Sequence, residues 1–153
     1  MSSPTGIDHI NEVVRELGRA LGKEDFQLDE EFQLTISIRR NTVVTLQYNP
    51  KSDELVVYSA VGSVAGIRDP VKLRSLLAAN FMWRETSGTT LGLELETSIV
   101  TLAIAVPAKD LDFTSLDALL DGFATTAEGW TKRLAAMTEE EHDSGGPIAG
   151  IRI

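Results

Sequence analysis

The sequence predicts an α+β fold in which three helices pack against one antiparallel sheet of five strands. Apolar residues recur at helical spacing in three segments. Five shorter segments are typical of strands: apolar and polar residues alternate in residues 32–38 and in residues 90–96, and residues 43–48 and 54–61 are rich in β-branched and aromatic residues. The predicted order along the chain is helix, three strands, helix, two strands, helix. Because strands mostly follow strands through short joints, the sheet is expected to be antiparallel.

The three helices are predicted from their apolar stripes and from the residues at their ends. The first runs from about Ile7 to Leu21, and Gly22 is a stop signal. The second begins after Asp69, a capping residue, with Pro70 at the first helical position. The third lies within residues 112–137.

The predicted strands cover residues 32–38, 43–48, 54–61, 90–96 and 99–106. The sequence NPKSD between the second and third strands is typical of a tight turn. Val43 with Val44, and Val56 with Val57, make these strands apolar on both faces. Either another molecule covers the second face, or helices partly cover both sides; the pattern leaves both interpretations open.

The stretch TSGTTLG before the fourth strand has two glycines, which raises the question of a phosphate-binding loop. Such a loop needs a lysine and a hydroxyl residue after its second glycine, at the start of a helix. Here Leu93 follows Gly92 inside a strand pattern. We therefore predict a bend at Gly88 that leads into a β-hairpin.

The length of 153 residues fits one compact domain, which we place at residues 1–137. Residues 138–153 are acidic and then glycine-rich, which is typical of a flexible tail. The formal net charge of −9 disfavours nucleic acid and acidic membrane surfaces as partners. The same charge keeps a protein soluble when it exposes apolar surface.

No catalytic motif is present. The chain has no cysteine, and its two histidines, His9 and His142, lie near opposite ends. No serine stands in a G-x-S-x-G motif. We therefore predict that the protein is not an enzyme and has no cofactor and no metal site.

The N-terminal sequence MSSPTGIDHINEVV has no basic flank and no continuous apolar stretch, so no signal peptide is predicted. No segment approaches the roughly 20 apolar residues of a membrane helix, and membrane insertion is not expected. The expected compartment is the cytoplasm.

The second half of the chain resembles the class I chaperones of bacterial type III secretion, the Tir chaperone (CesT-like) family. The resemblance lies in the order and spacing of LRSLLAANFMW, Gly88, TLGLELET, IVTLAIAVP and LDALLDGFATTAEGW. It covers Ile7 to about Met137. The turn ELETSI lacks the glycine common in the hairpin of that family, and the tail after Met137 is longer than the family core requires.

This resemblance implies a cytosolic bacterial homodimer without enzymatic activity, linked to virulence. Such a dimer binds the N-terminal segment of a secreted effector, keeps it soluble and competent for export, and needs no nucleotide. Its expected partners are a second copy of itself and the effector segment, and the export apparatus is a further candidate. The alternative is a regulatory protein on the same scaffold that binds another chaperone or a transcription activator.

The resemblance also places the binding sites. The candidate effector-binding residues are Phe32, Leu34, Ile36, Val44, Leu46 and Tyr48. The candidate dimer-interface residues are Leu73, Leu76, Leu77, Phe81 and Trp83. For the first set the alternative is simple core packing, and for the second it is packing of the same helix face on its own sheet.

Overall fold

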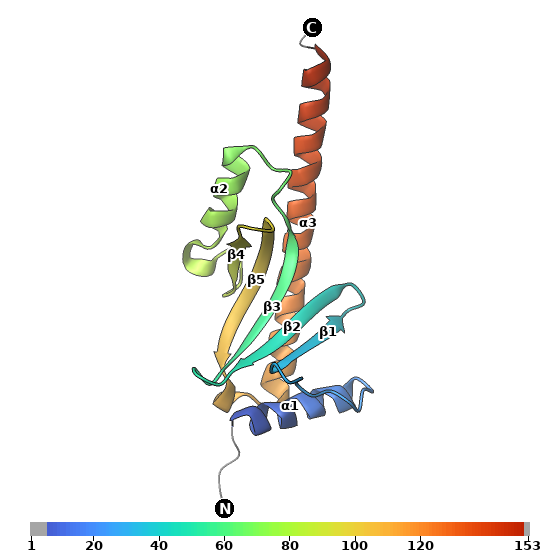
Figure 1. Ribbon diagram of the computed structural model, residues 1–153, viewed down its shortest axis with the longest axis vertical. Helices are drawn as coiled ribbons and strands as arrows, with labels where there is room; N and C mark the ends of the chain where they lie inside the picture. The colour runs from blue at the N-terminus through green and yellow to red at the C-terminus, as the bar shows by residue number, and fades with distance from the viewer. Residues whose placement is uncertain (1–5, 152–153) are drawn as a thin grey trace, which may run out of the picture. The chain divides into compact units, whose positions relative to one another are not determined.

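The structure is a computed structural model that describes residues 6–151, and side chains as far as residue 142. Figure 1 shows helices and strands in the predicted order, which confirms the α+β class with a five-stranded sheet. The elements are α1 (Gly6–Ala20), β1 (Gln33–Ile38), β2 (Thr42–Asn49), β3 (Glu54–Ser63), α2 (Pro70–Ala79), the 3-10 turn η1 (Phe81–Trp83), β4 (Thr90–Glu94), β5 (Ile99–Pro107), the 3-10 turn η2 (Ala108–Asp110) and α3 (Phe113–Ile151).

The sheet has the strand order β1-β2-β3-β5-β4. The β1–β2, β2–β3 and β4–β5 pairs are antiparallel, as predicted. In the turn between β2 and β3, the side-chain oxygen of Asn49 accepts the N–H of Lys51 at 3.0 Å, which is the chemistry expected of NPKSD. Strand β4 ends at Glu94 and not at the predicted residue 96, because the N–H of Ser98 closes a turn onto the carbonyl of Glu94 at 2.8 Å.

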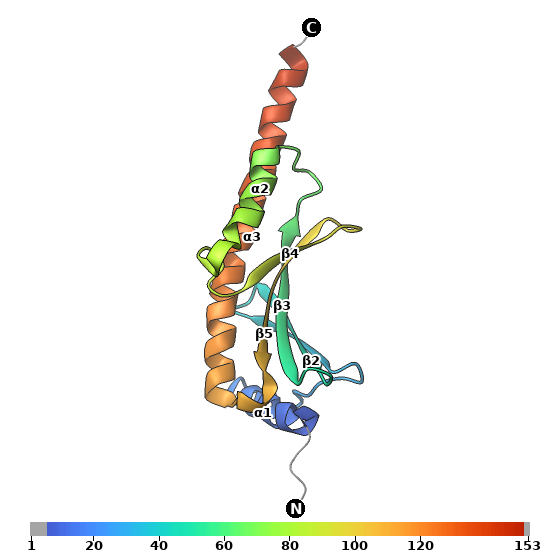
Figure 2. The same ribbon diagram turned by 90° about the vertical axis from the view of Figure 1, so that its left-hand side faces the viewer.

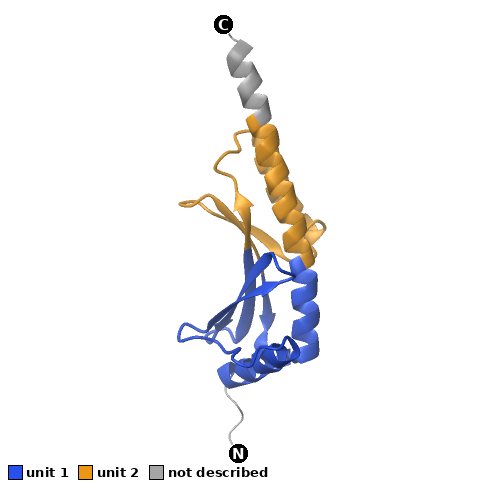
Figure 3. Cartoon of the chain, turned by 90° about the vertical axis from the view of Figure 1, so that its right-hand side faces the viewer, with its two compact units in different colours: residues 1–59, 104–124 blue, residues 60–103, 125–153 orange. Residues whose placement is uncertain are grey.

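The chain divides into two compact units (Figure 3). Unit 1 comprises residues 1–59 and 104–124, and unit 2 comprises residues 60–103 and 125–153. β3, β5 and α3 each contribute residues to both units. The single-domain organisation over residues 1–137 stays a prediction.

Unit 1 contains α1, β1 and β2 around an apolar core. The middle of the predicted stripe of α1 is its buried face, since residues at positions i, i+3, i+4 and i+7 of a helix share one side. The end of the stripe, Ala20 and Leu21, is exposed, and the helix ends at Ala20. The ring nitrogen Nε2 of His9 lies 2.8 Å from the carbonyl oxygen of Leu111, which accounts for this histidine without a ligand. The buried apolar residues of unit 1 are Ile10, Val13, Val14, Leu17, Leu28, Ile36, Val44, Leu46, Tyr48, Leu55, Val57, Ala108, Leu111, Leu116, Leu120, Phe123 and Ala124.

Unit 2 has a smaller core that includes Trp130. The indole N–H of Trp130 donates to the carbonyl oxygen of Glu85 at 3.1 Å, and the guanidinium of Arg133 lies 4.0 Å from the centre of the indole ring. These contacts anchor the turn that precedes β4. The buried apolar residues of unit 2 are Val61, Ile67, Ala79, Leu91, Val100, Leu102, Ala127, Trp130 and Leu134.

The TSGTTLG stretch forms the predicted bend. Gly88 has a φ of 85°, a conformation that glycine adopts without a steric penalty, and β4 begins at Thr90. The hydroxyl and the backbone N–H of Thr89 both donate to the carbonyl oxygen of Thr86. These hydrogen bonds lie within the bend itself.

Helix α3 does not end near residue 137, as the sequence suggested, but continues to Ile151. The run of glutamates after Met137 favours helix, because glutamate has high helix propensity. Whether residues 138–153 are flexible in solution stays a prediction. No helix in the described part of the chain is both long and apolar enough to cross a membrane.

Two helical glycines provide a matched test of this packing. A Cβ atom on Gly18 would lie 2.5 Å from the carbonyl oxygen of Lys23, whereas a Cβ on Gly129 meets nothing within 4 Å. We expect Gly18→Ala to lower the free energy of unfolding by about 1–3 kcal/mol through overpacking. Gly129→Ala should raise it by about 0.5–1 kcal/mol, because alanine favours helix.

Urea unfolding followed by far-ultraviolet circular dichroism measures both effects. If both variants raised the free energy of unfolding, the close packing of Gly18 against Lys23 would be contradicted.

Candidate protein-binding surfaces

Helix α2 leaves most of its apolar side chains exposed. All of its residues are described, and Ala79 alone is buried. The side chain of Leu77 is 76% exposed, and Leu73 is exposed as well. A helix that does not bury its leucines in its own unit is a candidate for contact with another molecule.

The turn η1 continues this exposed apolar surface. Phe81 is 67% exposed, and Met82 and Trp83 are also more than half exposed. Met82 and Trp83 have φ values of 55° and 54°, in the left-handed region that costs roughly 1–2 kcal/mol for a residue with a Cβ. The turn therefore holds three large apolar side chains outward at a cost in backbone energy, which is a feature typical of functional sites.

A pocket of about 310 Å³ lies between α2 and β4. It is lined by Val64, Leu73, Leu76, Leu77, Asn80, Leu91, Gly92, Leu93 and Val100. Figure 2 shows the β4–β5 turn extending away from α2, and Leu95 in that turn is 83% exposed. Seven exposed apolar residues of α2, η1, β4 and the β4–β5 turn are together called the α2–β4 surface: Leu73, Leu77, Phe81, Met82, Trp83, Leu93 and Leu95. Val71 of α2 is also exposed, but it lines a different pocket, beside Met137 of α3.

Asn80 joins α2 to β4 by two hydrogen bonds. Its side-chain amide N–H donates to the carbonyl of Leu91 at 3.0 Å, and its side-chain oxygen accepts the N–H of Leu91 at 2.8 Å. An asparagine side chain can satisfy both backbone groups of one residue because it carries a donor and an acceptor side by side. The pair fixes the C-terminal end of α2 beside the edge strand β4.

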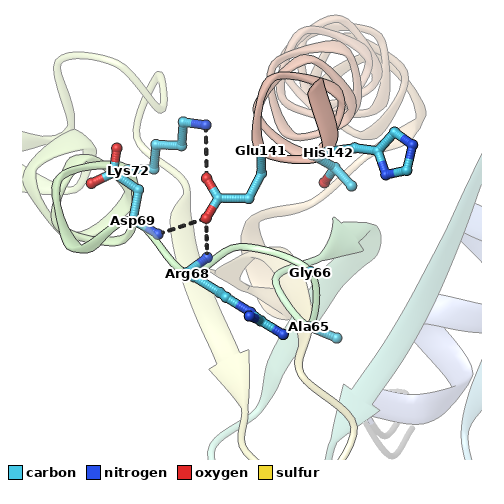
Figure 4. A pocket seen from close by; sticks show the side chains of 8 residues that line it. Ala65, Gly66, Arg68, Asp69, Lys72, Glu141 and His142 are labelled. Carbon is cyan, nitrogen blue, oxygen red and sulfur yellow. Dashed lines mark hydrogen bonds and ion pairs between the residues drawn. The ribbon is translucent and has the colours of Figure 1, made fainter. Parts of the chain in front are cut away.

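The N-terminal end of α2 is held by Asp69 and by Glu141 of α3. A carboxylate oxygen of Asp69 accepts the N–H of Val71 at 2.9 Å, as predicted for a capping residue. The Oε1 atom of Glu141 accepts the N–H of Arg68 at 2.6 Å and that of Asp69 at 2.9 Å (Figure 4). The Nζ of Lys72 lies 3.0 Å from Oε2 of Glu141.

These groups lie at a polar pocket of about 600 Å³ in unit 2. The hydrogen bond from Lys72 and the backbone bond from Arg68 hold the pKa of Glu141 below its usual range. Among the described residues, no cluster of His, Asp or Glu side chains has the arrangement of a metal site. His142 also lines this pocket, which fits contact between α3 and the segment that precedes α2.

The structure brings the predicted dimer-interface residues together. Leu73, Leu77, Phe81 and Trp83 are exposed on the α2–β4 surface, and Leu76 is half-buried in its pocket. Their role in a dimer stays a prediction. The sequence analysis missed Met82, Leu93 and Leu95.

In the sequence, Leu91, Leu93 and Leu95 alternate with less apolar residues, a pattern that predicts a buried strand face. Leu91 at the start of that alternation is buried, whereas Leu93 and Leu95 are exposed. A period of two predicts which residues share one face of a strand, but it does not predict how far along the strand other elements pack on that face.

The predicted effector-binding residues divide into two groups. Phe32 and Leu34 are accessible, and the rings of Phe32 and Tyr48 pack edge to face with centroids 6.3 Å apart. The other four, Ile36, Val44, Leu46 and Tyr48, are buried in unit 1. This burial favours the core-packing alternative for those four, and the effector-binding role of the whole set stays a prediction.

Tyr48 has a structural task of its own. Its hydroxyl donates to a carboxylate oxygen of Asp53 at 2.8 Å, across the turn between β2 and β3. Burial, together with the neighbouring Asp53, raises the pKa of Tyr48. The hydroxyl therefore stays protonated and keeps its hydrogen bond over the neutral range.

Strand β1 offers backbone groups at one end of the strand order. The N–H of Tyr48 donates to the carbonyl of Phe32, and the strands pair in the register Ile36 with Val44. In an antiparallel pair the bonded residues alternate, so the backbone groups of Thr35 and Ser37 point away from β2. The exposed side chain of Val43 on β2 adds apolar surface in the same unit.

The comparisons with known proteins agree with this architecture. The model of the Tir chaperone protein (CesT) family matches residues 12–131. No curated protein sequence gives a significant match.

Three solved structures with similar folds are complexes of two proteins. The ExsC–ExsE complex matches with a TM-score of 0.73 and 22% identity over 84% of this chain and 95% of the other. The HopA1–SchA chaperone–effector complex matches with a TM-score of 0.71 and 16% identity over 86% and 99%. The Yersinia pestis type III secretion chaperone SycH, in complex with a fragment of YscM2, matches with a TM-score of 0.61 and 20% identity over 78% and 98%.

At these identities the solved structures support the fold. The family match spans most of the chain and includes β1, α2, η1, β4 and the first part of α3. The chain therefore belongs to the Tir chaperone protein (CesT) family.

Proposed function

We propose that this protein is a type III secretion chaperone that acts as a homodimer in the bacterial cytoplasm. It binds the N-terminal segment of a secreted effector and keeps that segment soluble and competent for export. Family membership supports this function, and HopA1–SchA, a similar structure, is a chaperone–effector complex. The observation that carries the proposal is that each compact unit buries a core and still leaves an apolar surface open.

The α2–β4 surface of unit 2 is the proposed contact with a second copy. Its exposed residues are leucine, methionine and aromatic side chains, the types that are enriched in the cores of dimer interfaces. The same elements and the residues that follow them also carry exposed charges of both signs: Arg74 in α2, Arg84 after η1, Glu94 at the end of β4 and Glu96 in the β4–β5 turn. In a two-fold dimer a patch meets itself, so a patch with both signs can be self-complementary.

The β1 strand of unit 1 is the proposed contact with the effector segment. Thr35 and Ser37 present a backbone donor and acceptor each, to which an extended peptide can add as a further strand. Phe32 and Leu34 supply accessible apolar side chains beside those groups. Such binding holds a peptide through its main chain and needs neither catalysis nor a nucleotide.

A capture experiment tests the function as a whole. The tagged chain is isolated from its own bacterium under secretion-inducing conditions, the complex is trimmed with protease, and the protected fragment is identified by mass spectrometry. A protected N-terminal segment of a secreted protein is the expected result. Recovery of a transcription activator or of another chaperone in its place would favour the regulatory alternative.

We expect Leu77→Glu to convert the dimer to a monomer. Leu77 is 76% exposed in the single chain, so the charge should cost little folding stability. In an apolar interface the charge would be desolvated, and a loss of about 2–4 kcal/mol corresponds to a dissociation constant about 30–1,000 times higher. Sedimentation velocity at several concentrations measures this change.

The control is Val43→Glu, which places the same charge at an exposed apolar residue of unit 1. This variant should dimerise like the unmodified chain. A Leu77→Glu variant that is folded and still dimeric would remove α2 from the interface.

We expect Ser37→Pro to weaken effector binding while the fold persists. Proline lacks the N–H that Ser37 presents away from β2, and proline is tolerated on edge strands. The loss of one main-chain bond should weaken affinity for the protected effector peptide by about fivefold or more. Isothermal titration calorimetry measures the affinity.

Ser37→Ala, which keeps the N–H, is the matched control and should bind normally. If the proline variant is folded and binds the peptide with unchanged affinity, the peptide does not add to β1.

A further inference from the structure

Helix α2 is held mainly at its two ends. Between them its side chains make little buried contact, since Ala79 is its one buried residue. The C-terminal end is held by the paired hydrogen bonds of Asn80 to Leu91. The N-terminal end is held by Glu141, which reaches it from α3.

Glu141 satisfies backbone groups that α2 itself cannot satisfy. The N–H groups of Arg68 and Asp69 lie just before the first helical residue, Pro70, and both donate to one oxygen of the Glu141 carboxylate. The other oxygen accepts a hydrogen bond from the ammonium of Lys72, in the first turn of the helix. A carboxylate at this end of a helix is also favoured by the helix dipole.

The contact is well packed for a charged group. The side chains of Lys72 and Glu141 are each 17% exposed, and the ammonium of Lys72 also lies 3.3 Å from the carbonyl oxygen of Met137. The carboxylate of neighbouring Glu140 lies farther from the same ammonium, at 3.8 Å, and its side chain is 70% exposed. Glu141 is therefore the principal partner of Lys72. Figure 4 shows the carboxylate of Glu141 pointing from α3 toward the backbone of Arg68 and Asp69 and toward the ammonium of Lys72.

We propose that Glu141 is a positioning residue that holds the N-terminal end of α2 against α3 and thereby presents the α2–β4 surface to a second copy of the chain. Glu141 lies beyond residue 131, where the family match ends, and in the part of α3 that continues past the predicted helix end at residue 137. The inference rests on the proposed homodimer. Without Glu141, the C-terminal end of α2 would stay bonded to β4 through Asn80, and the N-terminal end of α2 would become mobile.

The experiment uses the full-length chain with Glu141→Ala, Glu141→Gln and the control Glu139→Ala. Glu139 lies on the same helix, is exposed, and gives the same change of charge when replaced. Hydrogen–deuterium exchange of residues 68–79 is measured in the Leu77→Glu background, so that dimer formation cannot mask it. The dimer dissociation constant is measured by sedimentation with Leu77 in place.

We expect Glu141→Ala to speed exchange in α2 and to raise the dimer dissociation constant, each by about tenfold. Exchange in β2 of unit 1 should keep the control value, which separates a local effect from general unfolding. Glu141→Gln should recover part of both losses, because an amide oxygen still accepts the two backbone N–H groups. Glu139→Ala should change neither quantity.

Unchanged exchange in α2 would overturn the proposal. Faster exchange with an unchanged dissociation constant would also overturn it, since α2 would then need no positioning. A monomeric unmodified chain is a different result: it would refute the homodimer itself, and the positioning role with it.

Discussion

The two hydrogen bonds between Asn80 and Leu91 are the constraint on which the α2–β4 surface depends. They connect the end of a helix to the backbone of an edge strand, and the pocket of about 310 Å³ lies between those two elements. Because Ala79 is the one buried residue of α2 and Leu76 is half-buried, hydrophobic packing contributes little to this connection. Polar contacts at the helix ends therefore arrange a surface whose apolar side chains stay available for a partner.

The two proposed binding surfaces differ in the groups that make the contact. On the α2–β4 surface the side chains provide the contact, and the left-handed backbone at Met82 and Trp83 helps to direct them outward. On β1 the backbone of Thr35 and Ser37 provides the contact, while neighbouring side chains such as Ile36 remain in the core. A surface that recognises main chain can accept many peptide sequences, whereas a side-chain surface suits one partner of fixed shape.

The acidic character of the chain fits this arrangement. With a net charge of −9, copies repel one another at long range, which opposes unspecific association of exposed apolar surface. Specific association then needs close apolar contact and local pairing of opposite charges. Arginines near α2 and glutamates near the β4–β5 turn could supply such pairs in a two-fold arrangement.

By itself, the sequence determined the order of elements, the pairing of consecutive strands within β1–β2–β3 and within β4–β5, the cap at Asp69 and the bend at Gly88, because each follows from local periodicity or backbone preference. The neighbouring position of β3 and β5 in the sheet was not predicted. The sequence also carried the family resemblance that the comparisons confirm. Only the tertiary structure decided how far the apolar face of each strand is covered: Leu91 is buried, while Leu93, two residues further on the same face of β4, is exposed. It also brought Glu141 to the backbone of Arg68, because a contact between residues far apart in the chain leaves no local signal.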